Sequence, residues 1–126
     1  MTLNLNYREM LILPYRQRGD LPPKSGIYYV GNDDCPVWYI GLASNLKRRH
    51  ANHHRQVQFE EMICAVIRYR TLPDEVLQRN TDLSKILTRL EKQAIYHYRP
   101  PLNGTPVPGQ SLICGTGLLI RYRMRL

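Results

Sequence analysis

The stretch Ser25–His54, SGIYYVGNDDCPVWYIGLASNLKRRHANHH, decides the expected fold of this chain of 126 residues. Gly26–Val30 and Val37–Gly41 are both rich in β-branched and aromatic residues, which predicts two strands. Between them Gly31–Asp34 has the composition of a turn, and strands so close along the chain usually pair as a hairpin. Ser44 is a good N-cap for a helix that runs to about the end of the stretch. The stretch therefore predicts two strands followed by a helix.

The rest of the chain predicts one more strand, one more helix and short elements at both ends. Met62–Tyr69 is the strand candidate. The second helix begins at Thr81 or Asp82 and ends before the next Pro-Pro pair, because a residue that precedes proline avoids helical dihedral angles. Leu11–Leu13 fits a short strand or the end of a helix, and Leu112–Tyr122 fits a last strand or a hairpin. This order predicts an α+β domain, a small antiparallel sheet flanked by helices.

The register of the hairpin decides where its tyrosines lie. If Tyr28 is opposite Tyr39, one face of the hairpin is fully apolar and the other carries the tyrosine pair. The pair is then either cross-strand stacking, which stabilises by about 0.5–1.5 kcal/mol, or part of a functional site. The apolar face consists of Ile27, Tyr29, Trp38 and Ile40.

The chain has an excess of positive charge. Eighteen Lys and Arg residues against ten Asp and Glu residues give a formal net charge of +8. Such an excess favours a polyanionic partner, of which nucleic acid is the first candidate, but a basic protein without such a partner has the same composition. No apolar stretch approaches the ~20 residues that span a bilayer, so no membrane partner is expected.

Three cysteines bear on the cellular compartment: Cys35, Cys64 and Cys114. Their odd number and wide spacing fit neither a zinc site nor a disulfide framework. We therefore expect free thiols and a cytoplasmic location, where thiols stay reduced.

A carboxylate interrupts the apolar face of the second predicted helix. Glu91 falls between Leu87 and Ile95 when successive residues are placed about 100° apart around the helix axis. A buried carboxylate is costly unless it is paired or bound to a metal. Its partner is either an arginine, in a structural ion pair, or a divalent cation, which prefers carboxylate and water oxygens.

Basic side chains crowd the first predicted helix. Arg49 and His53 are four residues apart and therefore share one face. Lys47, Arg48 and Arg55 face outward, where a basic surface is either simply solvated or contacts nucleic acid.

Taken together, these residues resemble the GIY-YIG nuclease family. Gly26-Ile27-Tyr28 and Tyr39-Ile40-Gly41 match its two signatures, and the remaining matches follow at familiar spacings. The resemblance covers about Ser25 to Asn103, which would be a small stand-alone catalytic domain. Residues 1–24 form an N-terminal extension without an assigned role, and residues 104–126 form a basic C-terminal extension expected to pack on the same domain. The matched catalytic positions are Tyr28, Tyr39, Arg49, His53, Glu91 and Asn103.

The resemblance implies an α+β domain with a central three-stranded antiparallel sheet. It also implies hydrolysis of nucleic-acid phosphodiester bonds, with DNA as the expected substrate and one Mg²⁺ or Mn²⁺ held by Glu91. Tyr28 would be the general base, and it needs help because a free tyrosine has a pKa near 10. Either His53 accepts its proton, or the metal and Arg49 lower its pKa. Arg49 would also offset charge on the phosphate.

Two further roles are implied by the same resemblance. Tyr39 would orient a phosphate oxygen or the attacking water, and Asn103 would hold the site together by hydrogen bonds. His50 and His54 have no counterpart in the resemblance and fit helix surface. The alternatives to an enzyme are a non-catalytic nucleic-acid-binding module on the same scaffold and a scaffold protein with an incidental basic face. The form of the nucleic acid, whether duplex, branched, single-stranded or RNA, stays open, as does the oligomeric state.

Overall fold

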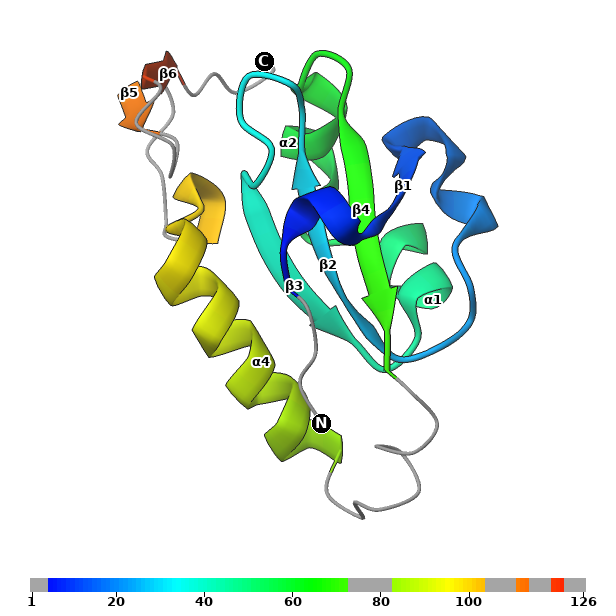
Figure 1. The fold of residues 1–126 in the computed structure, drawn as a ribbon. Coiled ribbons are helices and arrows are strands. Elements are labelled where there is room, and N and C mark those ends of the chain that lie inside the picture. The colour runs from blue at the N-terminus through cyan, green and yellow to red at the C-terminus, as the bar shows by residue number, and fades with distance from the viewer. Residues whose placement is uncertain (1–4, 73–82, 104–110, 114–118, 122–126) are drawn as a thin grey trace.

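A four-stranded antiparallel sheet forms the centre of the computed structural model, which describes residues 5–72, 83–103, 111–113 and 119–121. The strand order is β1-β4-β2-β3 (Figure 1). The α+β class is confirmed, but the expectation of three strands is wrong. A fourth strand pairs with the free edge of β4, with Leu11 opposite Tyr69, and it comes from the N-terminal segment without an assigned role. The strands are β1 Leu11–Pro14, β2 Gly26–Gly31, β3 Tyr39–Ala43 and β4 Val66–Thr71.

Helices cover both faces of this sheet. Two short helices, α1 and α2, pack on one face together with the 3₁₀ helix η2, whereas the long helix α4 packs against β3 and β2 on the other. Figure 1 shows α4 along the β3 side of the sheet. The sequence patterns did not predict α2. The helices are η1 Tyr7–Glu9, η2 Tyr15–Asp20, α1 Leu46–Ala51, α2 Gln56–Glu61, α4 Leu83–Tyr98 and η3 Pro101–Asn103.

A separate two-stranded antiparallel sheet lies near the C-terminus. β5 Ser111–Ile113 pairs with β6 Leu119–Arg121, which confirms the hairpin alternative for this segment. The bend between the two strands lies outside the described residues, and the packing of residues 104–126 on the domain stays a prediction.

The register of the β2–β3 hairpin differs from the expected one by two residues. Tyr28 lies opposite Gly41, and Tyr39 lies opposite Val30. The reason is a longer connection, which begins with a turn in which Cys35 bonds to the backbone and side chain of Asn32. A shift of two residues keeps every strand side chain on its face, so the two tyrosines still share one face of the sheet.

The bend before β3 exchanges two residues between the faces. Trp38 precedes the strand and packs into the cluster on the tyrosine side, whereas Val37 packs into the cluster under α4. The expected apolar face is therefore wrong for Trp38, because alternation applies only within a regular strand.

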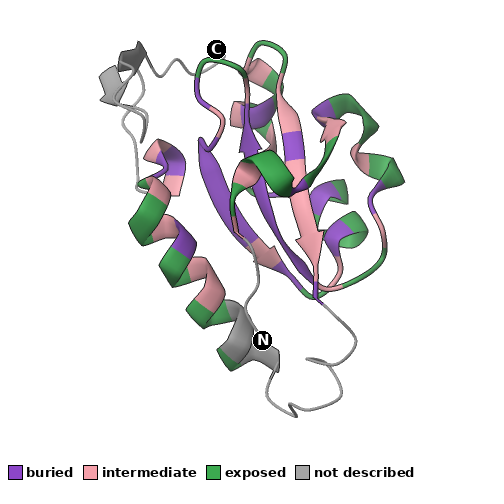
Figure 2. Ribbon diagram, viewed as in Figure 1, coloured by how far each residue is buried: buried purple, intermediate pink, exposed green. Residues whose placement is uncertain are grey.

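The strand β2 is buried along its whole length (Figure 2). It lies between β4 and β3, and a cluster of apolar side chains covers each of its faces. Any polar side chain on β2 must therefore find its partner inside the protein.

The first helix begins later and ends earlier than its sequence predicts. Asn45, not Ser44, is the N-cap, and its side chain accepts a hydrogen bond from the backbone of Arg48 at 3.0 Å. The helix stops at Ala51, because Asn52 adopts non-helical dihedral angles. The chain then turns before it enters α2.

Two expectations drawn from composition can be compared with the structure. Cys64 is an exposed free thiol, but Cys35 is disulfide-bonded, so the expectation of free thiols is wrong for Cys35. Within the part of the chain that is described, no helix is both long enough and apolar enough to cross a membrane.

Candidate active site

The phenol of Tyr28 is the most deeply placed polar group of the site. It projects from the central strand β2 and has no exposed surface. Its ring lies directly over Gly41 on β3, where a Cβ atom would overlap the ring and the hydroxyl of Tyr28. Tyr39 stacks beside it, with ring centroids 6.3 Å apart and an angle of 28° between the rings. Gly41 thus leaves the space that Tyr28 fills.

The hydroxyl of Tyr28 is hydrogen-bonded to His53. Its oxygen lies 2.6 Å from Nε2 of His53. The expectation that His53 shares a helix face with Arg49 is wrong, because α1 ends at Ala51 and His53 lies in the turn before α2. The turn nevertheless brings the imidazole over both tyrosine rings, with centroids 5.7 Å from Tyr28 and 5.3 Å from Tyr39.

Arg49 lies on the solvent side of the tyrosine pair. Burial raises the pKa of Tyr28, and hydrogen bonding to Arg49 opposes that shift. Burial also raises the pKa of Tyr39, and the positive charge of Arg49 again opposes it. The residue itself is exposed, so its guanidinium is accessible to an anionic ligand while it contacts the tyrosines.

Glu91 reaches the same region from α4. Burial raises the pKa of its carboxyl group, and the charge of Arg49 opposes this. The carboxylate in turn raises the pKa of Tyr28 and Tyr39, so all four groups interact electrostatically. The edge strand β3 contacts both helices, with α4 and α1 packed against it from opposite faces of the sheet.

The site fits a divalent ion that is held by one protein carboxylate. Among the described residues, no group of three or more His, Cys, Asp or Glu side chains forms a preassembled metal site. Mg²⁺ is commonly bound through one or two carboxylates, with water and substrate phosphate completing its shell. Glu91 is half-buried and interacts electrostatically with Arg49, so it is the carboxylate that could serve as such a single ligand.

Asn103 acts on the backbone of β3. Its side-chain oxygen accepts a hydrogen bond from the Ile40 amide at 2.8 Å, and its side-chain nitrogen donates to the Ile40 carbonyl at 2.8 Å. The amide of Leu102 also donates to the carbonyl of Trp38 at 3.0 Å. These bonds occupy the free edge of β3, the strand that carries Tyr39 and Gly41.

His50 is a residue that the sequence patterns placed wrongly on the helix surface. It is fully buried, and its ring centroid lies 4.3 Å from that of Tyr28 in an edge-to-face contact. Burial lowers its pKa to about 4, so it is neutral at physiological pH. His54, in contrast, is exposed beside Arg49. The four-residue spacing from Leu46, which is also buried, was the available signal for His50.

Two hollows with charged residues in their lining lie on helices that carry site residues. One, of about 360 Å³, lies at the start of α1 and is lined by Arg48 and Arg49 together with Ser44, Asn45 and Asn52. The other, of about 410 Å³, lies on α4 and is lined by Lys85, Thr88, Arg89 and Lys92. The sequence patterns predicted Lys47, Arg48 and Arg55 as basic surface; the first two are exposed and Arg55 is half-buried. They did not predict the basic surface of α4, although Lys85, Arg89 and Lys92 recur at helical spacing.

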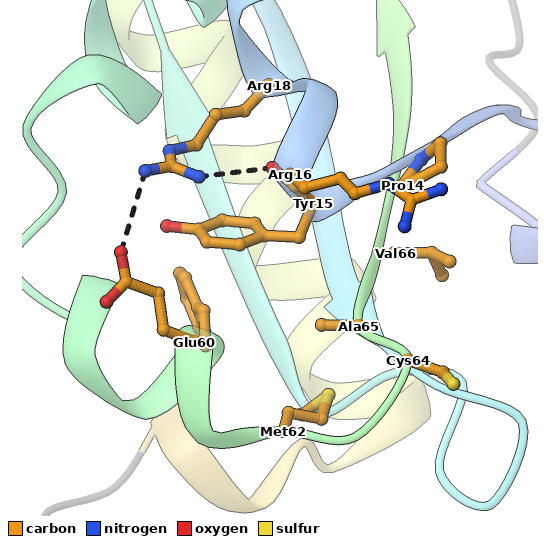
Figure 3. A pocket seen from close by; sticks show the side chains of 10 residues that line it. Pro14, Tyr15, Arg16, Arg18, Glu60, Met62, Cys64, Ala65 and Val66 are labelled. Carbon is orange, nitrogen blue, oxygen red and sulfur yellow. Dashed lines mark hydrogen bonds and ion pairs between the residues drawn. The ribbon is translucent and has the colours of Figure 1, made fainter.

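A larger cavity, of about 530 Å³, lies away from these residues (Figure 3). It is formed between η2 and α2, and Arg18 crosses it to reach Glu60 at 3.6 Å. None of the six predicted catalytic residues lines it.

Comparison with known proteins finds similarity to a bacterial protein from two Brucella species. The chain is 35% identical over 83 residues to UvrABC system protein C from Brucella abortus (strain 2308) and, to the same degree, from Brucella suis biovar 1 (strain 1330). Over that segment the chain is homologous to UvrABC system protein C. The segment is 66% of this chain, but it covers only 13% of the length of these relatives. No protein-family model matches the chain, and no solved structure matches it.

Gly41→Ala tests the packing of Tyr28. The added Cβ overlaps a buried ring that has little room to move, so we expect a loss of about 1–3 kcal/mol in the free energy of unfolding. Chemical denaturation measures this loss. Gly19→Ala is the matched control, because nothing lies within 4 Å of the Cβ position there. Equal stability of the two variants would show that Gly41 does not hold the space for Tyr28.

Proposed function

We propose that the chain is a metal-dependent endonuclease of the GIY-YIG type that hydrolyses phosphodiester bonds of nucleic acid, with DNA as the expected substrate. The observation that carries the proposal is the meeting of Tyr28, Tyr39, Arg49, His53 and Glu91 at the β3 edge. These residues come from β2, β3, α1, the following turn and α4. The homology with UvrABC system protein C supports the same class of function.

In this proposal the protein side chains orient the phosphate and handle the proton of the attacking water. Arg49 is exposed beside both tyrosines, where its charge can offset negative charge that builds on the phosphate. Tyr28 takes the proton from the water, and Tyr39 orients the water or a phosphate oxygen. Glu91 would hold Mg²⁺ or Mn²⁺, which when bound supplies Lewis-acid polarisation of the phosphate.

In this proposal the two hollows offer positive charge to the nucleic-acid backbone on the helices that carry Arg49 and Glu91. The hollow at α1 adjoins Arg49, and the hollow on α4 lies on the helix that carries Glu91. Lys47 and Arg55 add positive charge near α1. With a net charge of +8, phosphate contacts of this kind favour binding that weakens with salt.

Glu91→Gln tests the proposed metal role. The amide keeps the size of the side chain but loses the charge that a divalent ion requires, so we expect cleavage with Mg²⁺ or Mn²⁺ to be lost and binding to be retained. The assay uses plasmid, branched and single-stranded DNA, with EDTA as the metal-free condition. Asp34→Asn, at an exposed carboxylate in the β2–β3 loop, is the control.

Each outcome of this assay separates the proposal from its alternative. Full activity in Glu91→Gln contradicts the metal role of Glu91. Tight, salt-sensitive binding without cleavage by the wild-type protein favours the non-catalytic binding module on the same scaffold. Binding of nucleic acid by the basic hollows does not require catalytic activity.

The dependence of cleavage on pH tests Tyr28 as the base. Burial raises the pKa of its hydroxyl above the ordinary tyrosine value, so the unprotonated form is scarce at neutral pH. A base must be unprotonated to accept a proton, and each pH unit below the pKa lowers that fraction tenfold. We expect kcat/KM, which reports the free enzyme, to rise roughly tenfold per unit between about pH 7 and about pH 9. A rate that is flat or falls over this range contradicts the assignment.

A further inference from the structure

The second ring nitrogen of His53 has its own hydrogen-bond partner. The backbone amide of Arg55 lies 2.9 Å from Nδ1 of His53 and donates to it. A backbone N–H can only donate, so Nδ1 must be an acceptor and carries no hydrogen. A neutral imidazole carries its single hydrogen on the other nitrogen, which is Nε2.

This assignment fixes the direction of the bond to Tyr28. Nε2 lies 2.6 Å from the Tyr28 hydroxyl oxygen, so the imidazole donates and the phenol oxygen accepts. The opposite direction requires the hydrogen on Nδ1, where it would face the Arg55 amide hydrogen. The geometry of one backbone amide thus selects the tautomer, as the second partner of a histidine generally does.

The surroundings of His53 disfavour the doubly protonated ring as well. Burial, together with the neighbouring His50 and Arg49, lowers the pKa of His53 to about 3. An imidazolium would also lose the bond from the Arg55 amide, because Nδ1 would then carry a hydrogen. The ring is held in place by stacking on His50 and His54, at centroid distances of 5.3 and 4.6 Å.

We infer that His53 is a positioning residue that donates its Nε2 hydrogen to Tyr28 and does not accept the proton of Tyr28. The consequence of this inference for cleavage rests on the proposed function. Arg49, which also interacts with the hydroxyl, has only donors. Two donors therefore meet at the Tyr28 oxygen, an arrangement that stabilises the phenolate and leaves the proton of Tyr28 to depart toward the substrate side.

The tautomer can be measured directly on the wild-type protein. Nitrogen-15 NMR of the histidine side chains distinguishes a hydrogen on Nε2 from one on Nδ1, and it needs neither substrate nor cleavage. We expect the signal of His53, assigned by its loss in His53→Gln, to show the neutral form with hydrogen on Nε2 at pH 7. Hydrogen on Nδ1, or a doubly protonated ring, overturns the inference even if the protein cleaves DNA.

The pair His53→Gln and His53→Ala tests the consequence for cleavage. Glutamine offers an N–H donor of similar reach but cannot take up a proton near neutral pH, whereas alanine offers neither. We expect the Gln variant to stay within roughly tenfold of the wild-type rate and the Ala variant to fall roughly 10- to 100-fold further, the size of one lost hydrogen bond to a charged group. An equal, large loss in both variants overturns the inference, provided that circular dichroism shows both to be folded. If neither the variants nor the wild type cleaves, the proposed function fails, and the NMR result alone decides the inference.

Discussion

The hydroxyl of Tyr28 is the polar group around which the site is arranged. It lies on a strand that is covered on both faces and paired on both edges, so in the folded protein its partners are other protein groups. Three features of the structure meet this constraint. Gly41 leaves room for the ring, His53 supplies a hydrogen bond, and Arg49 brings a positive charge. A leucine at this position would need none of the three, so the arrangement has a cost that a purely structural core would not carry.

The edge position of β3 is where Tyr39 and Arg49 lie close enough to interact with Glu91, which comes from the other face of the sheet. The inner edge of β3 pairs with β2, and its outer edge is occupied by the side chain of Asn103 instead of a further strand. α4 and α1 both pack against β3, and Glu91 of α4 interacts electrostatically with Arg49 of α1.

Local sequence patterns predicted the parts of this fold that depend on neighbouring residues. The hairpin, the third strand and the long helix follow from composition and periodicity, and the apolar arc around Glu91 predicted its half-buried position. The register of the hairpin depended on the connection from Asn32 to Trp38, whose bends composition does not specify. The strand side chains nevertheless stayed on the expected faces of the sheet, because the register differed by two residues, an even number.

Other features depended on distant contacts and could not be predicted in this way. β1 is short and half-exposed, and only its pairing with β4 makes it a strand. The early end of α1 places His53 in a turn, where the Arg55 amide and Tyr28 bind its two nitrogens. His50 reads as one more basic position on a helix, and it is the packing of α1 against the sheet and η2 that buries it.

The most direct test of this account is the single-turnover cleavage rate of Tyr28→Phe. Phenylalanine keeps the ring over Gly41 and removes only the oxygen, so binding of DNA and the fold should be retained while the rate falls by roughly 10²–10⁴, the usual contribution of a general base. A variant that is folded, binds DNA and cleaves at the wild-type rate would contradict the account, because the hydroxyl of Tyr28 would then have no part in the chemistry.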